Sequence, residues 1–121
     1  MQPIRTFDLF TTEAISASGS ATSMNIDLNQ PQPAGYFSVY VELTGTGTGQ
    51  VTYELSNDGT NYLTPSSAAD IVTAHTAASG PGSDGKDIYS FTPELGAYMR
   101  IKVTETGGAN AIAVTVVLAV Q

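Results

Sequence analysis

Apolar and polar residues alternate with a period of two along most of this chain, and this pattern restricts the chain to β-structure. Residues 37–43 place Phe37, Val39, Val41 and Leu43 on one side and polar residues on the other. Successive side chains of a strand point to opposite faces of a sheet, so such a segment has one buried face and one wet face. The pattern therefore predicts a strand whose apolar side lies in a core.

The same alternation recurs elsewhere, and it predicts inner faces made by Val51, Tyr53 and Leu55, by Met24, Ile26 and Leu28, and by Met99, Ile101 and Val103. Strands are expected near residues 4–10, 12–17, 22–28, 36–43, 49–56, 70–74, 86–92, 97–105 and 109–120, of which one or two merge. No segment carries a convincing helical stripe. We predict an all-β, single-domain β-sandwich of about eight antiparallel strands over residues 1–121, either jelly-roll-like or immunoglobulin-like.

The last predicted strand is apolar on both faces. One face is made by Ile112, Val114, Val116, Leu118 and Val120, and the other is made largely by alanine and by Val117. Such a strand is either central in a sandwich or covered on its outer side by a neighbouring subunit. We therefore count Val117 among the candidate partner contacts.

Glycine-rich segments separate the strands. TGTGTGQ at residues 44–50 and ETGGAN at residues 105–110 are both predicted to be hairpin connections. LSNDGTNYLTP at residues 55–65 is predicted to be a hairpin corner, because Gly59 readily takes the positive φ that a tight turn needs. A metal loop and a sugar-binding loop are the alternatives for this segment.

The charge balance disfavours some partners. The formal net charge is −7, from 11 acidic and 4 basic residues, so the surface repels nucleic acid and anionic lipid. No stretch approaches the ~18 apolar residues of a membrane span. Only 12% of residues are charged, and a weakly charged surface rich in Ser, Thr, Gly and Ala suits contact with other proteins.

The sequence gives little support for a catalytic site or a metal site. The chain has one histidine, His75, which we expect on the surface or in a loop, and it has no cysteine. Glu42 and Glu54 face outward on predicted neighbouring strands, where paired carboxylates would suit glycoside hydrolysis, but solubility is the simpler explanation. We predict no enzyme, no catalytic residue and no cofactor.

Calcium is the better metal candidate, with oxygens from Asp84, Asp87 and Asp58, although turn formation explains these aspartates equally well. Tyrosines offer flat faces for sugar stacking, and the candidates are Tyr36, Tyr40, Tyr62 and Tyr98. Tyr40 and Tyr98 serve equally well as subunit contacts or as cross-strand pairs.

Several motifs together carry a resemblance. SNDGTNY at residues 56–62, the preceding TGTGTG and the later YMRIKVTETGG resemble small virion accessory proteins of tailed bacteriophages, of the capsid decoration (cement) or head-fibre type. The resemblance covers residues 36–120. It implies a non-enzymatic protein of the capsid surface that is made in the host cytoplasm and forms an oligomer, often a trimer. Its partner would be the major capsid protein or another virion protein.

We therefore predict a structural virion protein that stabilises a phage capsid through protein–protein contacts. An N-terminal arm of about residues 1–5 is expected to reach onto a neighbour. The candidate partner contacts are Met1, Gln2, Pro3, Ile4, Val117, Tyr40 and Tyr98. The alternative is a carbohydrate-binding β-sandwich module, with or without a stabilising calcium ion.

Overall fold

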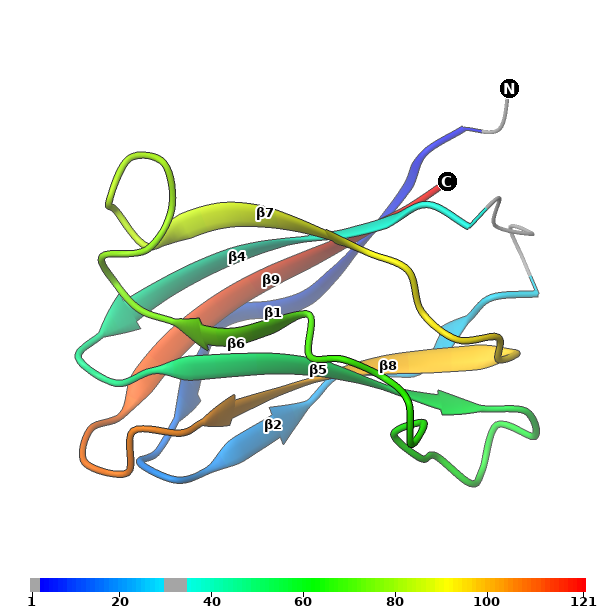
Figure 1. Ribbon diagram of the computed structural model, residues 1–121, viewed down its shortest axis with the longest axis horizontal. Coiled ribbons are helices and arrows are strands. Elements are labelled where there is room, and N and C mark those ends of the chain that lie inside the picture. The colour runs from blue at the N-terminus through cyan, green and yellow to red at the C-terminus, as the bar shows by residue number, and fades with distance from the viewer. Residues whose placement is uncertain (1–2, 30–34) are drawn as a thin grey trace.

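Two antiparallel sheets pack face to face in the computed structural model, which describes residues 3–29 and 35–121 (Figure 1). Sheet A holds, in order, β1 (Arg5–Ile15), β9 (Ile112–Val120), β4 (Phe37–Gly45) and β7 (Lys86–Phe91). Sheet B holds, in order, β2 (Ser20–Thr22), β8 (Tyr98–Glu105), β5 (Gly49–Ser56) and β6 (Val72–His75), and β3 (Ile26–Asp27) pairs with β8. The predicted all-β sandwich is confirmed.

The strand pairing is that of a jelly roll. β1 pairs with β9, β2 with β8, β4 with β7, and β5 with β6, so the chain forms one long antiparallel ribbon that is rolled into two sheets. In sheet A, β4 also pairs with β9, and in sheet B β5 pairs with β8. An immunoglobulin-like sandwich has a different strand order, so the first of the two predicted topologies holds.

Two predicted hairpins are wrong, because their strands lie in different sheets. β4 and β5 flank the TGTGTGQ segment but belong to sheets A and B, and the same holds for β8 and β9 around ETGGAN. Both segments are corners between the sheets. Gly45 makes one corner with φ +100°, and a Cβ atom there would lie 2.7 Å from the Ala111 carbonyl oxygen. Alternation marks a buried face, but it does not say which sheet the strand joins.

The core lies between the inner faces of the two sheets, as the alternation predicts. Fully buried side chains include Val39, Val41, Leu43, Val114, Val116 and Leu118 from sheet A and Val51, Met99, Ile101 and Val103 from sheet B. Burial of apolar area at about 25 cal/mol per Å² drives this packing. β9 is central in sheet A, so its buried face contributes to the middle of the core.

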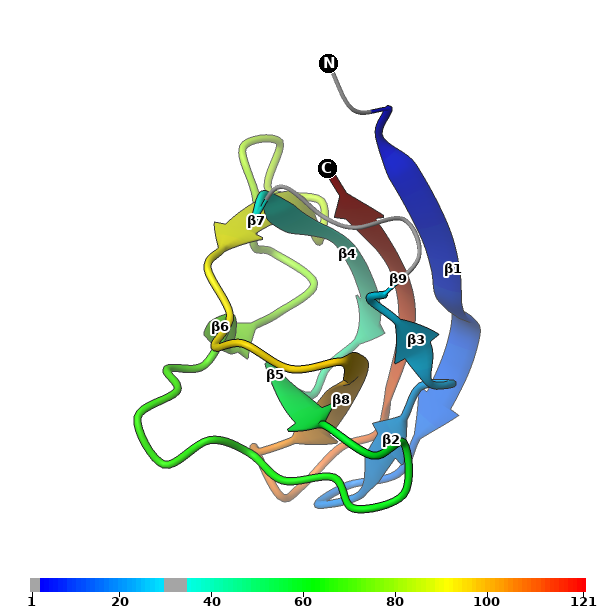
Figure 2. The same ribbon diagram turned by 90° about the vertical axis from the view of Figure 1, so that its right-hand side faces the viewer.

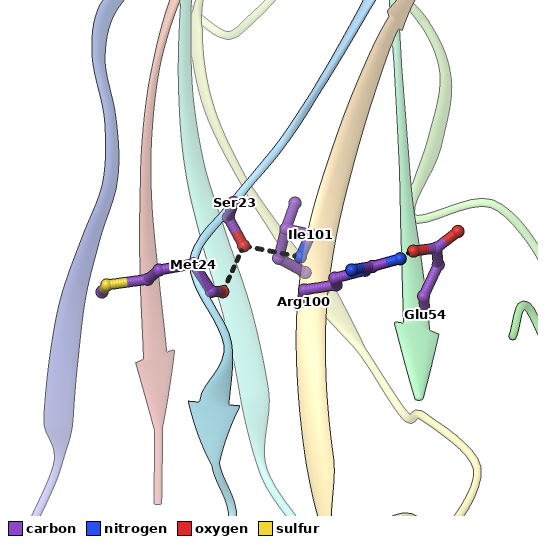
Figure 3. A network of polar contacts seen from close by, with 5 residues as sticks. All are labelled: Ser23, Met24, Glu54, Arg100 and Ile101. Atoms are coloured by element: carbon purple, nitrogen blue, oxygen red, sulfur yellow. Dashed lines mark hydrogen bonds and ion pairs between the residues drawn. The ribbon is translucent and has the colours of Figure 1, made fainter. Parts of the chain in front are cut away.

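Met24 was expected in the core but is 54% exposed. The predicted strand 22–28 is split into β2 and β3, because Ser23 interrupts the pairing with β8 (Figure 3). The Ser23 hydroxyl accepts the Ile101 N–H at 2.9 Å and donates to the Met24 carbonyl at 2.9 Å. The Ser23 hydroxyl thus takes the place of a backbone carbonyl as the acceptor of the Ile101 N–H. The regular alternation of buried and exposed side chains is interrupted at this point, and Met24 is exposed.

The first strand begins at Arg5, where the predicted N-terminal arm of about residues 1–5 ends. Arg5 already belongs to β1 and pairs with Val120, while Pro3 and Ile4 precede the strand and are exposed. Met1 and Gln2 lie outside the described residues. β1 merges two predicted strands and keeps register irregularities between Asp8 and Phe10 and between Phe10 and Glu13. Within the described ranges, no helix has the length and apolar character to cross a membrane.

His75 is fully buried, so its predicted place on the surface is wrong. Its Nδ1 lies 2.7 Å from the Tyr89 hydroxyl and its Nε2 lies 2.8 Å from the Gly85 carbonyl oxygen. Both ring nitrogens therefore have partners, as buried polar groups require. His75 ties β6 to β7 across the two sheets, which is a structural role.

Candidate interaction surface

The outer face of sheet A carries a row of side chains that crosses all four strands. Val117 on β9 lies opposite Asp8 on β1 and Tyr40 on β4, and Tyr40 lies opposite Ile88 on β7. Ile88 is 64% exposed. Directly opposed residues of antiparallel strands point to the same face, so Val117, Tyr40 and Ile88 form one apolar ridge.

A shallow trough lies beside this ridge. Ser38, Ser90 and Ala119 occupy the next row of the sheet, and Ile4 and Tyr36 stand beyond them at the sheet's end. The trough encloses about 180 Å³. The small side chains of its floor and the exposed apolar side chains of Ile4 and Tyr36 at its end make the outer face of sheet A uneven.

The outer face of sheet B is different in chemistry. Its exposed rows carry mainly threonine and charged residues, and Glu54 and Arg100 form an ion pair at 2.6 Å (Figure 3). Glu42 lies on the outer face of sheet A, paired in register with Lys86, so Glu42 and Glu54 face opposite sides of the sandwich. The paired-carboxylate arrangement that glycoside hydrolysis needs is therefore not formed by these two residues.

Tyr40 sits in the middle of the apolar ridge with its hydroxyl directed to Glu42. The Tyr40 hydroxyl donates to Glu42 Oε2 at 3.3 Å. Partial burial, followed by the nearby Glu42 carboxylate, raises the pKa of Tyr40 above its usual value. Tyr40 thus stays an uncharged phenol at neutral pH and offers an apolar face with a polar tip.

The predicted contact residues do not all come together. Ile4, Tyr40 and Val117 lie on the outer face of sheet A, and Pro3 precedes Ile4. Tyr98 lies on the other side of the molecule, on β8, where it pairs with Ser56. The four tyrosines proposed as a sugar platform are likewise divided between the two sides. The guanidinium of Arg100 lies 4.2 Å from the ring centre of Tyr62 and covers one face of that ring.

The segment 55–65 forms a tight loop after β5, as predicted. Leu55 and Leu63 exchange two backbone hydrogen bonds of 2.8 and 2.9 Å, which close the corner. The Asp58 carboxylate accepts the Asn61 and Thr60 N–H groups and the Asn61 amide, and these donors hold the pKa of Asp58 well below its usual range. The hydrogen bonds of the Asp58 carboxylate therefore stabilise the loop to which Asp58 itself belongs.

The predicted calcium ligands are not brought together. Asp58 follows β5 at one end of the sandwich, while Asp84 and Asp87 lie at the start of β7, at the opposite end. Among the residues that the structure describes, no three carboxylate or imidazole groups gather as metal ligands. The Asp84 carboxylate accepts the Lys86 N–H at 3.2 Å, which is a turn function.

Replacing Gly59 by valine is expected to destabilise the fold by about 1–2 kcal/mol. Gly59 has φ +78°, and a Cβ atom there would lie 3.4 Å from the Tyr98 ring. Urea unfolding of Gly59→Val measures the loss, and Gly59→Asn, which tolerates positive φ, should lose less. Unchanged stability of Gly59→Val would show that the corner is not conformationally demanding.

Glu105 stabilises the end of the sandwich that lies opposite Gly59, because it joins several connections between strands there. Its carboxylate is buried and accepts four backbone N–H groups at 2.8–3.0 Å, from Ser18, Thr48, Gly107 and Gly108. These donors come from three different connections between strands. They lower the pKa of Glu105 from 4.5 to about 2, with the Ser18 and Thr48 bonds as the largest causes.

The stability of the protein is expected to fall as the pH drops from 4.5 toward 2. A carboxyl group whose pKa is lower in the folded chain stabilises the fold above its unfolded pKa, here 4.5. This contribution is lost as the pH falls through the folded pKa. Urea midpoints measured from pH 7 to pH 2 test this, and the stability difference between the native chain and Glu105→Gln should shrink over the same range. A constant difference would contradict the assignment.

Comparisons with known proteins reveal the fold alone. No protein-family model matches the chain, and no curated protein matches its sequence. Among solved structures, 98% of the chain matches 32% of VP2 from an infectious bursal disease virus subviral particle, with a TM-score of 0.58 and 11% identity. It also matches 19% of the tailspike protein 4 structure of bacteriophage CBA120, over 98% of the chain, with a TM-score of 0.54 and 12% identity.

A third similar structure is PliG from Aeromonas hydrophila, a periplasmic inhibitor of g-type lysozyme. It matches over 98% of this chain and 86% of its own, with a TM-score of 0.50 and 11% identity. The chain thus spans about a third of VP2 and about a fifth of the tailspike structure. Similar folds thus occur in viral and non-viral proteins, so the fold by itself does not define the function.

Proposed function

We propose that this chain is a non-enzymatic structural protein of a phage particle, which binds the outside of the capsid and stabilises it through protein–protein contacts. Two similar folds support a place in a virus particle, since VP2 forms a subviral particle and the tailspike, matched in its enzymatically active domain, belongs to a bacteriophage. The motif resemblance of residues 36–120 points in the same direction. The partner would be the major capsid protein or another virion protein.

The apolar ridge on the outer face of sheet A is the observation that carries the proposal. Val117, Tyr40 and Ile88 form a ridge on it, and the outer face of sheet B has no equivalent among its described strand residues. An apolar ridge that is flanked by polar residues and a few charges is typical of a protein contact. Covering this face would also explain why β9 is apolar on both sides.

The edges of the sheets favour contact through a face rather than by strand addition. β1 is irregular at two positions, and β2, β3 and β6 are short. On the edge strand β7, the Lys86 and Ile88 N–H groups donate to the carboxylates of Asp84 and Asp87. Short, irregular or side-chain-capped edges resist pairing with another strand.

Stabilisation would follow from mass action. A protein that binds only the assembled shell shifts the equilibrium toward that shell, by an amount set by its affinity and concentration. An oligomer multiplies the effect because its copies bind neighbouring capsid subunits together. The resemblance implies a trimer, which size-exclusion chromatography with light scattering measures directly.

Gradient-purified virus particles test the proposal. Mass spectrometry of the particles should find the chain at a fixed ratio to the major capsid protein. The variant Ile88→Glu should lose incorporation, because it places a charge on the apolar ridge, while Thr52→Glu on the outer face of sheet B should be incorporated normally. Absence of the chain from particles, together with glycan-array binding by a monomer, would support the carbohydrate-binding alternative instead.

A further inference from the structure

A groove of about 500 Å³ lies at the end of the sandwich where the chain leaves β5 and β7. This end, with the connections that follow the two strands, faces the viewer in Figure 2. The connection from β5 to β6 forms one side and the connection from β7 to β8 forms the other. It is lined by Leu55, Ser56, Asn57, Asp58, Asn61, Leu63, Pro65, Glu94 and Leu95. Most of this lining is the LSNDGTNYLTP segment, so the hairpin corner also forms a surface.

The groove is held in place by hydrogen bonds on both sides. On one side, the backbone bonds between Leu55 and Leu63 close the corner. On the other, the Glu94 N–H donates to the Tyr53 hydroxyl at 3.2 Å, and the Ala97 N–H donates to the Ser56 carbonyl at 3.1 Å. A groove that is already formed binds without the entropic cost of ordering its walls.

Two exposed leucines, Leu63 and Leu95, line this groove. Leu95 is 97% exposed and Leu63 is 73% exposed, which makes them the most exposed large apolar side chains of the described residues. Isolated exposed leucines are common, but two that line one groove form a local apolar patch. An occupant with apolar side chains would remove this area from water.

The charges in the groove have one sign. Asp58 and Glu94 contribute carboxylates, and none of the described lining residues is basic. The N–H donors around Asp58 keep that carboxylate ionised at neutral pH. A cationic group next to an apolar one therefore complements this surface, and an anionic ligand does not.

We propose that this groove binds a short extended protein segment in which apolar side chains lie next to lysine or arginine. The apolar side chains contact Leu63 and Leu95, and the cationic group lies near Asp58 and Glu94. This second surface lies at the end of the sandwich, whereas the surface proposed above is a sheet face. The inference stands whether or not the chain belongs to a virus particle.

Fluorescence anisotropy with synthetic peptides tests the inference. The probe is a labelled peptide in which two leucines alternate with two lysines, and the matched peptides replace leucine by serine or lysine by glutamate. We expect the leucine–lysine peptide to bind at least about tenfold more tightly than either matched peptide. Equal binding of the leucine–lysine and serine–lysine peptides would mean simple attraction to an acidic protein and would overturn the proposal.

Variants of the full chain test whether the leucine–lysine peptide binds in the groove. Leu95→Ser and Glu94→Gln should each weaken the peptide severalfold, and neither should change folding, because Leu95 is almost wholly exposed and Glu94 lies in a connection. Met24→Ser and Glu13→Gln make matched changes at exposed residues that do not line the groove, and they should leave the affinity for the peptide unchanged. Equal losses for the groove and control variants, or displacement of the peptide by a neutral oligosaccharide, would contradict the proposal.

Discussion

The variant Glu105→Ala is expected to lower the midpoint of thermal unfolding by on the order of 10 °C. The substitution removes one carboxylate and leaves the N–H groups of Ser18, Thr48, Gly107 and Gly108 without their acceptor. Buried donors without partners are costly, and here they belong to three connections at once. Differential scanning calorimetry at pH 7 measures the change.

Two further variants separate this effect from simple loss of a charge. Glu105→Gln keeps one acceptor oxygen and should recover part of the loss, while Glu13→Ala removes an exposed carboxylate from β1 and should change the midpoint little. If Glu105→Ala and Glu13→Ala had equal effects, the carboxylate would not be holding the corners of the sandwich together.

Truncation of Leu118 to alanine is the second large expected effect, with a loss of about 3 kcal/mol in the free energy of unfolding. Leu118 is fully buried on β9, the central strand that pairs with both β1 and β4. The cost combines lost apolar burial with the cavity that remains between the sheets. Urea denaturation followed by circular dichroism gives the value.

The neighbouring residue provides the matched control. Val117 is on the same strand but points to the outer face of sheet A, so Val117→Ala should cost less than about 1 kcal/mol in the free chain. Comparable losses at Leu118 and Val117 would mean that the outer face is as closely packed as the core. That result would remove the basis for treating the outer face as available to a partner.

Period two in the sequence was sufficient to predict the strands and their buried faces, because one face of nearly every strand meets the other sheet. It does not predict which sheet each strand joins, so it cannot distinguish the two corners between the sheets from hairpins. Met24 was misplaced because a single hydroxyl, that of Ser23, replaces a ladder bond. His75 was misplaced because its partners, Tyr89 and the Gly85 carbonyl, are distant in sequence.

The interaction surface was predictable in part. The doubly apolar strand indicated Val117, and the register of β4 and β9 places Tyr40 directly opposite it. Ile88 was missed, although it is the apolar member of the alternating face that also carries Lys86 and Ser90. Tyr98 shares the alternation of Tyr40 but belongs to the other sheet, which local sequence does not show.

Hydroxyl-radical footprinting of the chain, in purified virus particles and free in solution, measures directly whether the outer face of sheet A is covered in the particle. Tyr40 and Tyr98 are both half-buried tyrosines, and they lie on the outer faces of sheets A and B respectively. We expect Tyr40 and Ile88 to be oxidised several-fold more slowly in the particle, while the oxidation rate of Tyr98 changes little. Equal protection of Tyr40 and Tyr98, or protection of Tyr98 alone, would contradict it.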